Sequence, residues 1–553
     1  MRKSGVIILL VVLGFTSGFI AAKKDLFSAK DIRSAQKLIG INFSRKQIDT
    51  LTRYLHDNFI GYEEMRKISL DNEISPAFQF HTNFHQDRSS SHHAIHWEIN
   101  PAIQLPDTLQ ELAFYSITDL ASLIQSKKIT SLALTEFFLA RIKKYDDTLK
   151  SVISITQDIA IRQAKKADAE IAQGKYRGVL HGIPYGLKDL FTVRGTKTTW
   201  GAAPYKEQSF DYDATVVKRL EEAGTVLIAK LVSGELARGD VWFGGKTKNP
   251  WDLKQGASGS SAGPGAAVAA GLVPFAIGTE TLGSIMAPSA RCGVTGLRPT
   301  FGRVSRYGAM TLSWSMDKPG PIGRNATDCA IVLETIMGSD GKDQTAIDTP
   351  LLDSKLFDPL HLRVSFEKSI LKKDSSYYSK QLKSYLELLK QKGLTVTEAE
   401  LPTKGIPFKG LDVIFRAEAG AFFDELVISG RENLLSEQNR GSRANSLRQS
   451  RFIPAVEYIQ ANRHRQVLMN KMDSLFQNID VLIVPSDTTT RQLLITNLTG
   501  HPSMALPIGI DDKGHPMSVI LIGNLFQEDK LIAMAQWMQT VTAYHLRRLK
   551  YFK

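Results

Sequence analysis

Cysteine is scarce in this chain: 553 residues contain two, Cys292 and Cys329. Two cysteines exclude a disulfide framework and a zinc site made of cysteines. They leave two alternatives open, one bond between Cys292 and Cys329 or two buried free thiols. The fold must therefore rest on burial of apolar side chains. The chain is 43% hydrophobic, which at this length suffices for one large domain or two.

Long blocks of basic residues are also absent, although the net charge is +13. The lysines and arginines are scattered or occur in pairs, such as Lys127-Lys128 and Lys165-Lys166, and no basic block with interleaved aromatic residues occurs. Proteins that bind nucleic acid usually gather their positive charge on one stretch or face. We therefore expect a basic surface and no nucleic-acid partner.

Long apolar runs are absent after the N-terminus. Residues 1–22 carry two early positive charges, an apolar run from Val6 to Phe15 and a small-residue end, which is the layout of a secretory signal peptide. An uncleaved signal anchor is the alternative, because the run to Ala22 is close to the minimum length of a membrane span. We expect export to the periplasm or the cell exterior, with a mature chain that begins near residue 23.

Residues 23–115 predict an accessory helical region and an irregular connector. Ser44 and Gln47 match a capping box in front of apolar residues at helical spacing. The connector that follows is rich in histidine: His81, His85, His92, His93 and His96. His92 and His96 have the i, i+4 spacing of a helix, but no carboxylate or cysteine stands at a ligand spacing. A solvated loop is therefore favoured over a metal site.

From about residue 116 to 545 the pattern becomes regular, with strands and helices in alternation. Apolar strands are expected at 152–156, 183–188, 225–229, 273–277, 481–484 and 518–522. This alternation predicts an α/β catalytic domain with a partly parallel sheet. Residues 353–478 are more helical and more polar, which favours a substrate-shaping segment between two parts of the sheet.

Two turns of small residues stand out in this domain. The first, Gly256–Gly263, reads GASGSSAG, and the second, Thr281–Ser284, reads TLGS. One apolar helix, expected at 262–270, and one strand separate them, so both turns can return to the same sheet edge. Glycine in such turns lets backbone N–H groups approach a ligand. The pattern is typical of nucleophilic catalysis with backbone oxyanion donors.

A serine nucleophile needs a base, and no histidine lies near either turn. Lys188 ends the apolar strand expected at 183–188, and burial disfavours the charged form of an amine. Asp189 follows it, but in a strand this carboxylate points to the opposite face. Lys188 is the candidate base; the alternative is a surface lysine or a partner of Asp189.

Four stretches, taken in order, resemble the motifs of one family. They are Gly182–Asp189 (GIPYGLKD), Ser258–Gly263 (SGSSAG), Gly278–Ser289 (GTETLGSIMAPS) and Asn497–Pro507 (NLTGHPSMALP). They are similar to the lysine strand, the glycine-serine motif, the nucleophile motif and a late stretch of the amidase signature family. The resemblance extends over about residues 116–538.

This resemblance implies a mixed, partly parallel central sheet covered by helices on both faces. It also implies a Ser–Ser–Lys triad in which Ser284 attacks the amide carbonyl and Ser260, usually held by a cis peptide in this family, relays protons to Lys188. Ser261 is an auxiliary residue. The implied oxyanion hole consists of the backbone N–H groups of Thr281, Leu282, Gly283 and Ser284. No metal and no organic cofactor is implied.

Three residues depart from the family's nucleophile motif. Glu280 stands in place of aspartate, Leu282 in place of glycine and Met286 in place of arginine. Leucine would be costly at position 282 if the turn required a positive φ there. The departures concern substrate preference more than the triad, whose three residues are all present.

The resemblance implies hydrolysis of a small-molecule or peptide amide through a serine acyl-enzyme. One alternative is the glutamine-hydrolysing subunit of a tRNA-dependent amidotransferase, against which the export signal argues because such complexes are cytosolic. Another is an inactive amidase-like binding module, against which the complete triad argues. Gly259–Gly263 also matches the GxSxG elbow, with Ser261 as nucleophile. That elbow needs a preceding strand, and 249–255 reads as a loop.

Overall fold

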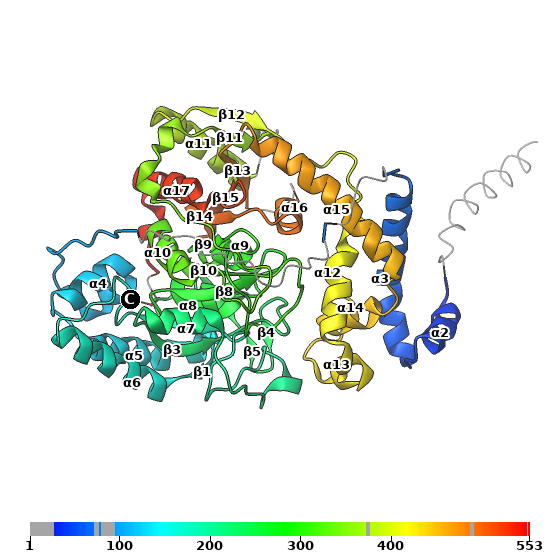
Figure 1. Ribbon diagram of the computed structural model, residues 1–553, viewed down its shortest axis with the longest axis horizontal. Helices are drawn as coiled ribbons and strands as arrows, with labels where there is room; N and C mark the ends of the chain where they lie inside the picture. Colours follow the sequence, from blue (N-terminus) through cyan, green and yellow to red (C-terminus); the bar gives the residue numbers. More distant parts are fainter. Residues whose placement is uncertain are drawn as a thin grey trace, which may run out of the picture.

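The computed structural model describes residues 27–70, 77–78, 95–371, 376–486, 491–549 and 551–552 (Figure 1). The expected signal segment, 1–22, and four of the five connector histidines lie outside the described residues. Among the described helices, none combines the length and apolarity that a membrane span requires.

An eleven-stranded sheet is the centre of the described structure, in the order β1-β3-β2-β8-β10-β9-β14-β15-β13-β11-β12. Its strands are β1 (Val152–Ile155), β2 (Pro184–Lys188), β3 (Val226–Leu231), β8 (Ala276–Glu280), β9 (Thr295–Arg298), β10 (Lys318–Gly323), β11 (Val364–Glu367), β12 (Val396–Ala399), β13 (Val481–Pro485), β14 (Ser503–Ile510) and β15 (Pro516–Gly523). Strand β2 is parallel to β3 and β8, and β11 is parallel to β12 and β13, whereas the other neighbours are antiparallel. The mixed, partly parallel sheet is confirmed.

Two small hairpins lie beside the main sheet: β4 (Val241–Trp242) with β5 (Gly245–Lys246), and β6 (Lys248–Asn249) with β7 (Asp252–Gly256). The reading of 249–255 as a loop is therefore wrong, because β7 is a strand that leads into the first serine turn. It pairs with β6 and not with the central sheet.

Helices cover both faces of the sheet (Figure 1). The α-helices are α2 (Ala29–Leu38), α3 (Arg45–Arg66), α4 (Ile117–Gln125), α5 (Ser131–Leu149), α6 (Gln157–Ala172), α7 (Thr215–Glu222), α8 (Ala262–Ala269), α9 (Met286–Cys292), α10 (Ala326–Ile336), α11 (Tyr377–Gln391), α12 (Phe408–Phe422), α13 (Asp424–Ile428), α14 (Arg443–Ser450), α15 (Ala455–Phe476), α16 (Gln492–Thr499) and α17 (Glu528–Thr542). Short 3₁₀ turns are η1 (Leu109–Phe114), η2 (Ala203–Tyr205), η3 (Ser354–Leu356), η4 (Pro359–His361), η5 (Lys368–Leu371), η6 (Arg431–Leu434) and η7 (Tyr544–Leu546). Strand β2 contacts both α5 and α8, and β10 contacts both α8 and α10.

One strand lies later in the chain than its apolar residues predict. Val273–Ile277 is the expected strand, whereas β8 begins at Ala276 and ends at Glu280. Pro274 has no N–H to give to a ladder, and pairing with β2 begins at Ala276. The shift carries Thr279 and Glu280 into the sheet, where both are buried.

The segment 353–478 contributes both to the central sheet and to a group of helices. Its first part supplies β11 and β12, which extend the edge of the sheet. Only its second part, α12 to α15, is helical throughout, and α3 of the N-terminal region packs against α12, α14 and α15 (Figure 1). The expected capping box at the start of α3 is present, with Gln47 N donating to Ser44 Oγ.

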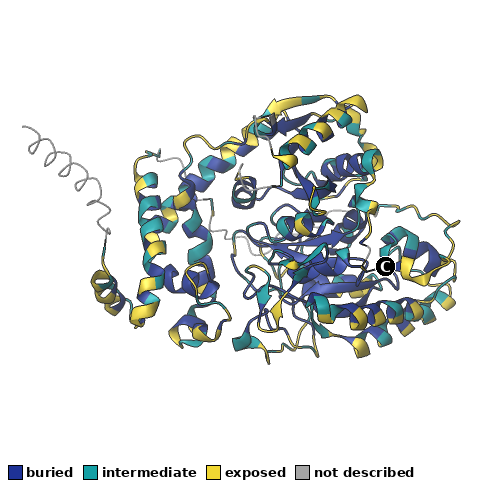
Figure 2. Cartoon of the chain, turned by 180° about the vertical axis from the view of Figure 1, so that it is seen from behind, coloured by how far each residue is buried: buried dark blue, intermediate teal, exposed yellow. Residues whose placement is uncertain are grey.

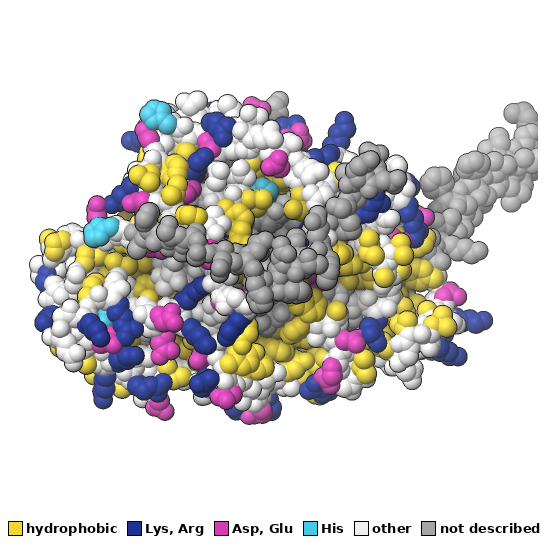
Figure 3. Space-filling model, viewed as in Figure 1, with side chains coloured by type: hydrophobic (Ala, Val, Ile, Leu, Met, Phe, Trp, Pro, Cys, Tyr) yellow, Lys and Arg dark blue, Asp and Glu magenta, His cyan; other side chains and the backbone are white. Residues whose placement is uncertain are grey.

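Burial follows the layers. The strands β2, β3, β8, β9, β10 and β13 are buried along their whole length, whereas α2 and the outer face of α3 are largely exposed (Figure 2). On the face seen in Figure 3, basic and acidic side chains are interspersed. The two cysteines are free thiols, both buried.

Candidate active site

Lys188 lies at the carboxyl end of β2 with its amine surrounded by neutral oxygen atoms. Its Nζ is 2.8 Å from Ser260 Oγ, 3.0 Å from Ser261 Oγ and 2.8 Å from Thr279 Oγ1. The Thr279 carbonyl oxygen is 3.4 Å away. The side chain is fully buried, because β2 is covered on both sides by parallel neighbours and on its faces by helices.

The environment of Lys188 favours the neutral amine. Burial lowers its pKa to about 7, although the more distant carboxylates of Asp317 and Glu280 raise it. Asp189 does not contact Lys188: its Oδ1 is 2.6 Å from Lys230 Nζ, on β3, and its Oδ2 accepts from Thr199. The expected burial of Lys188 is confirmed. Asp189, expected on the opposite face of the strand, pairs with Lys230.

Ser260 and Ser261 stand in the turn before α8. The Gly259–Ser260 peptide bond is cis, as the resemblance implied. A Cβ at position 259 would lie 1.7 Å from the carbonyl oxygen of Gly239, so only glycine fits there. Both serine side chains are buried. Glycine at 259 thus lets the turn press close enough for both hydroxyls to reach Lys188.

Ser284 lies in the second turn, between β8 and α9, and is half-buried. Its carbonyl oxygen accepts a hydrogen bond of 3.1 Å from Ser261 N, so the two serine turns are joined through their backbones. The structure therefore brings Lys188, Ser260 and Ser261 into direct contact and places Ser284 in the adjoining turn. The expected convergence of the two turns is what the backbone shows.

The backbone N–H groups of residues 281–284 are available as hydrogen-bond donors. Within the described residues, the N–H groups of Thr281, Leu282, Gly283 and Ser284 donate no hydrogen bond to another protein group. Gly283 has a φ of +90°, whereas Leu282 does not have a positive φ. Leucine is therefore compatible with the turn, since the left-handed conformation falls on the glycine that follows it.

Glu280 fixes the shape of this turn, a role that the sequence did not reveal. Its Oε2 accepts from Ile285 N at 2.8 Å and Met286 N at 2.9 Å. Its Oε1 accepts from Arg298 Nη1 at 2.5 Å and Asn497 Nδ2 at 2.7 Å. Burial raises the pKa of this carboxyl, but Arg298 and the hydrogen bonds outweigh burial and hold the pKa below its ordinary value.

A second buried acid supports the other side of the turn. Asp317 accepts from Thr281 Oγ1 at 2.5 Å and from the N–H groups of Leu312 and Ser313. With Lys318 and Thr279 it lines a small cavity of about 20 Å³ next to the turn. Lys318 is fully buried and donates to the Met316 carbonyl. Asp317 precedes β10 and Lys318 begins it, and neither residue belongs to a sequence motif described above.

The other sequence-derived sites gain no support. No cluster of three His, Cys, Asp or Glu side chains in the described part of the chain could hold a metal ion. Ser261, the nucleophile of the GxSxG alternative, is 3.0 Å from Lys188 and donates to the Thr279 carbonyl. Since β7 is not part of the central sheet, the strand of an elbow is not supplied by that sheet.

A family profile described as "Amidase" matches residues 133–532. One subunit of the glutamyl-tRNA(Gln) amidotransferase of Thioalkalivibrio sulfidiphilus is 33% identical over 482 residues, covering 79% of this chain and 99% of that protein. The corresponding protein of Ectopseudomonas mendocina is 34% identical, covering 78% and 98%.

Solved structures of amidases resemble this chain over the same large share of its length. The native peptide amidase of Stenotrophomonas maltophilia superposes with a TM-score of 0.70 at 28% identity, covering 80% of this chain and all of that one. An amidase family protein from Bacillus anthracis gives a TM-score of 0.71 at 25% identity, covering 80% and 93%. The chain therefore belongs to the amidase family, whose members act on carbon–nitrogen bonds.

Proposed function

We propose that this protein hydrolyses a carboxylic amide through an acyl-enzyme on Ser284, with Ser260 and Lys188 as its proton relay. The observation that carries the proposal is the 2.8 Å contact between Lys188 Nζ and Ser260 Oγ in a fully buried setting. An amine with a pKa of about 7 is half unprotonated near neutral pH and can serve as a base.

The neighbours of Lys188 direct its lone pair. A neutral amine has two N–H donors and one lone pair. Ser261 Oγ and Thr279 Oγ1 can accept the two N–H groups, because the Ser261 hydroxyl donates its own hydrogen to the Thr279 carbonyl. The lone pair then faces the Ser260 hydroxyl. Ser261 and Thr279 are in this proposal positioning residues for the base.

The reaction follows from this arrangement. Ser284 Oγ attacks the amide carbonyl while its proton passes to Ser260 Oγ and the Ser260 proton passes to Lys188 Nζ. The oxyanion accepts from the backbone N–H groups of 281–284, which donate to no other group among the described residues. The relay then returns a proton to the leaving amine as the C–N bond breaks. Water attacks the ester by the same relay and releases the acid and Ser284.

Transfer of glutamine-derived ammonia is a second candidate, favoured by 33–34% identity to glutamyl-tRNA(Gln) amidotransferase subunits over nearly their whole length. Simple hydrolysis of a peptide or small amide is favoured by the likeness to a peptide amidase and by the leader-like residues 1–22. The two share the relay and differ in whether the chain works alone. A second part of our proposal is export, which N-terminal sequencing of the protein from its native cell fractions tests directly.

The deciding experiment is labelling with a serine-reactive fluorophosphonate, followed by peptide mass spectrometry, alongside release of amine or ammonia from an amide panel that includes glutamine. We expect one label on Ser284 and its loss in Ser284→Ala, with turnover lower by about three orders of magnitude or more. A label that persists in Ser284→Ala and disappears in Ser261→Ala overturns the proposal in favour of the elbow mechanism.

A further inference from the structure

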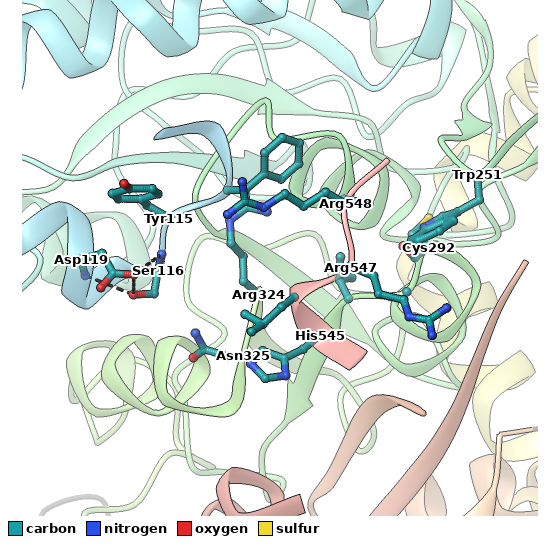
Figure 4. Close-up of a pocket in the computed structure, with 15 residues that line it drawn as sticks. Tyr115, Ser116, Asp119, Trp251, Cys292, Arg324, Asn325, His545, Arg547 and Arg548 are labelled. Atoms are coloured by element: carbon teal, nitrogen blue, oxygen red, sulfur yellow. Dashed lines mark hydrogen bonds between the residues drawn. The ribbon is translucent and has the colours of Figure 1, made fainter. Parts of the chain in front are cut away.

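A second cavity, of about 170 Å³, lies away from the serine turns and is lined by none of Lys188, Ser260 and Ser284. Figure 4 shows its walls: the start of α4 with Tyr115, Ser116 and Asp119, Arg324 and Asn325 before α10, and the C-terminal segment made of η7 and the residues after it. The carboxyl end of α9 completes it. Elements from both ends of the catalytic region therefore meet here.

Arginine dominates the charge of this cavity. Arg324, Arg547 and Arg548 line it (Figure 4). The guanidinium groups of Arg324 and Arg548 lie 5.2 Å and 5.6 Å from the centroid of the Phe114 ring. Besides burial, the charges of Arg141 and Arg548 lower the pKa of Arg324, whereas Asp328 raises it, so the arginines repel one another here. An anion in the cavity would offset this repulsion.

Arg324 has carbonyl partners but, among the described residues, no carboxylate. Its Nη2 donates to the Ala113 and Val273 carbonyl oxygens at 2.5 Å and 3.3 Å, and its buried Nε has no acceptor in the same part of the chain. Burial lowers its pKa to about 10, which leaves the guanidinium charged at neutral pH. A buried donor without an acceptor is the group that a bound anion would satisfy.

The nearby acids do not balance the arginines. Asp119, the one acid among the described residues of the wall, accepts from Ser116, which is its capping partner. Glu111 reaches Arg548 only at 3.5 Å, between exposed side chains. Behind the wall, burial raises the pKa of Asp328 to about 7, although the hydrogen bond from Ile117 N and the charge of Arg324 lower it, so this acid offsets only part of the Arg324 charge at pH 7. Within the described residues Arg547 forms no ion pair, and burial lowers the pKa of His545.

We propose that this cavity binds a compact anion with two or more negative charges, of the phosphate, phosphomonoester or dicarboxylate class. The guanidinium fork binds phosphate and carboxylate oxygens in pairs of hydrogen bonds. A volume of about 170 Å³ holds roughly five or six groups of water size, at about 30 Å³ each. That space accommodates inorganic phosphate or a short dicarboxylate.

The test titrates the full chain with inorganic phosphate, and separately with succinate, at constant ionic strength set by chloride. Calorimetry is expected to give saturable binding at one site, and the melting temperature is expected to rise with ligand concentration. The ligand that binds more tightly distinguishes the phosphate from the carboxylate source. Neither readout uses catalytic activity, so the result is independent of the proposed hydrolysis.

Variants locate the site. Arg547→Gln with Arg548→Gln is expected to weaken binding by tenfold or more, and Arg324→Gln to abolish it. The matched control is Arg194→Gln, because Arg194 is 65% exposed and pairs with Asp211 outside the cavity. Since Arg324 also holds backbone carbonyls, the surface double variant decides if Arg324→Gln fails to fold. Absence of saturable binding, or unchanged affinity in the double variant, overturns the proposal.

Discussion

Lys188 and Lys230 lie on adjacent parallel strands, one register position apart, and both side chains are fully buried. Lys230 is 2.6 Å from the carboxylate of Asp189. Lys188 has hydroxyl and carbonyl oxygens within hydrogen-bond range and, among the described residues, no carboxylate in contact. A carboxylate favours the charged amine and neutral oxygens leave burial unopposed. Two buried lysines in one sheet therefore differ in role: Lys230 forms a structural ion pair, and Lys188 is a candidate base.

The first way to break this comparison is to remove each amine in turn. Lys188→Met is expected to lower kcat/KM by about a thousandfold, within the range for loss of a general base, and to leave the protein folded. Lys230→Met is expected to leave the kcat/KM of the folded protein unchanged. Steady-state kinetics with circular dichroism checks both. A Lys188→Met enzyme that keeps the rate and pH profile of the wild type shows that Lys188 is only structural.

The free energy of unfolding should fall more in Lys230→Met than in Lys188→Met, the reverse of the order expected for activity. Lys230→Met leaves Asp189 buried without its cation, and breaking a buried pair in this way costs about 3–5 kcal/mol. Lys188→Met removes an amine that has no carboxylate partner among the described residues and replaces it with an apolar group, so a smaller loss is expected. Chemical denaturation measures both free energies of unfolding. Equal losses would contradict the distinction between the two lysines.

The comparison is sharpened by giving Lys188 a carboxylate of its own. The wild-type kcat/KM should rise with pH through an ionisation near the Lys188 pKa of about 7, because only the unprotonated amine is a base. Thr279→Asp is expected to move this rise toward higher pH, since the new charge favours the ammonium form. Thr279→Asn is the matched control without charge. A profile that does not move in Thr279→Asp excludes Lys188 as the titrating base.

The smallest effect concerns the orientation of the amine. Ser261→Ala removes one acceptor for a Lys188 N–H group, which is worth about 1 kcal/mol for a single hydrogen bond. A fall in kcat of about fivefold to tenfold is expected, with labelling of Ser284 retained. Ser258→Ala, in the same turn but without contact to Lys188 among the described hydrogen bonds, is the control. Loss of labelling in Ser261→Ala alone would point to the elbow mechanism.

Local pattern predicted much of this site. The apolar strand before Lys188 predicted its burial, and the alternation of strands and helices predicted a partly parallel sheet, whereas its mixed character was implied by the family resemblance. Sequence could not show that Glu280, a departure from the family's aspartate, would accept four hydrogen bonds. Arg298 reaches it from another strand of the sheet, and Asn497 lies 217 residues further along the chain. The predicted start of β8, at residue 273, was wrong because apolar side chains do not indicate which backbone N–H groups form hydrogen bonds with a neighbouring strand.

Short strands were also beyond reach. β7 is polar and only half-buried, so its alternation gave no signal. β11 and β12 are four residues each and are flanked by helices, which concealed them in a polar segment.

The tie between Glu280 and Asn497 has a consequence for biosynthesis. The turn that carries Ser284 is held in part by the side-chain amide of Asn497, which donates to Glu280. Asn497 is synthesised more than two hundred residues after Glu280. A nascent chain contains Lys188, Ser260 and Ser284 long before this hydrogen bond can form. We therefore expect the proposed acyl transfer to begin only after Asn497 has been synthesised and has folded against Glu280.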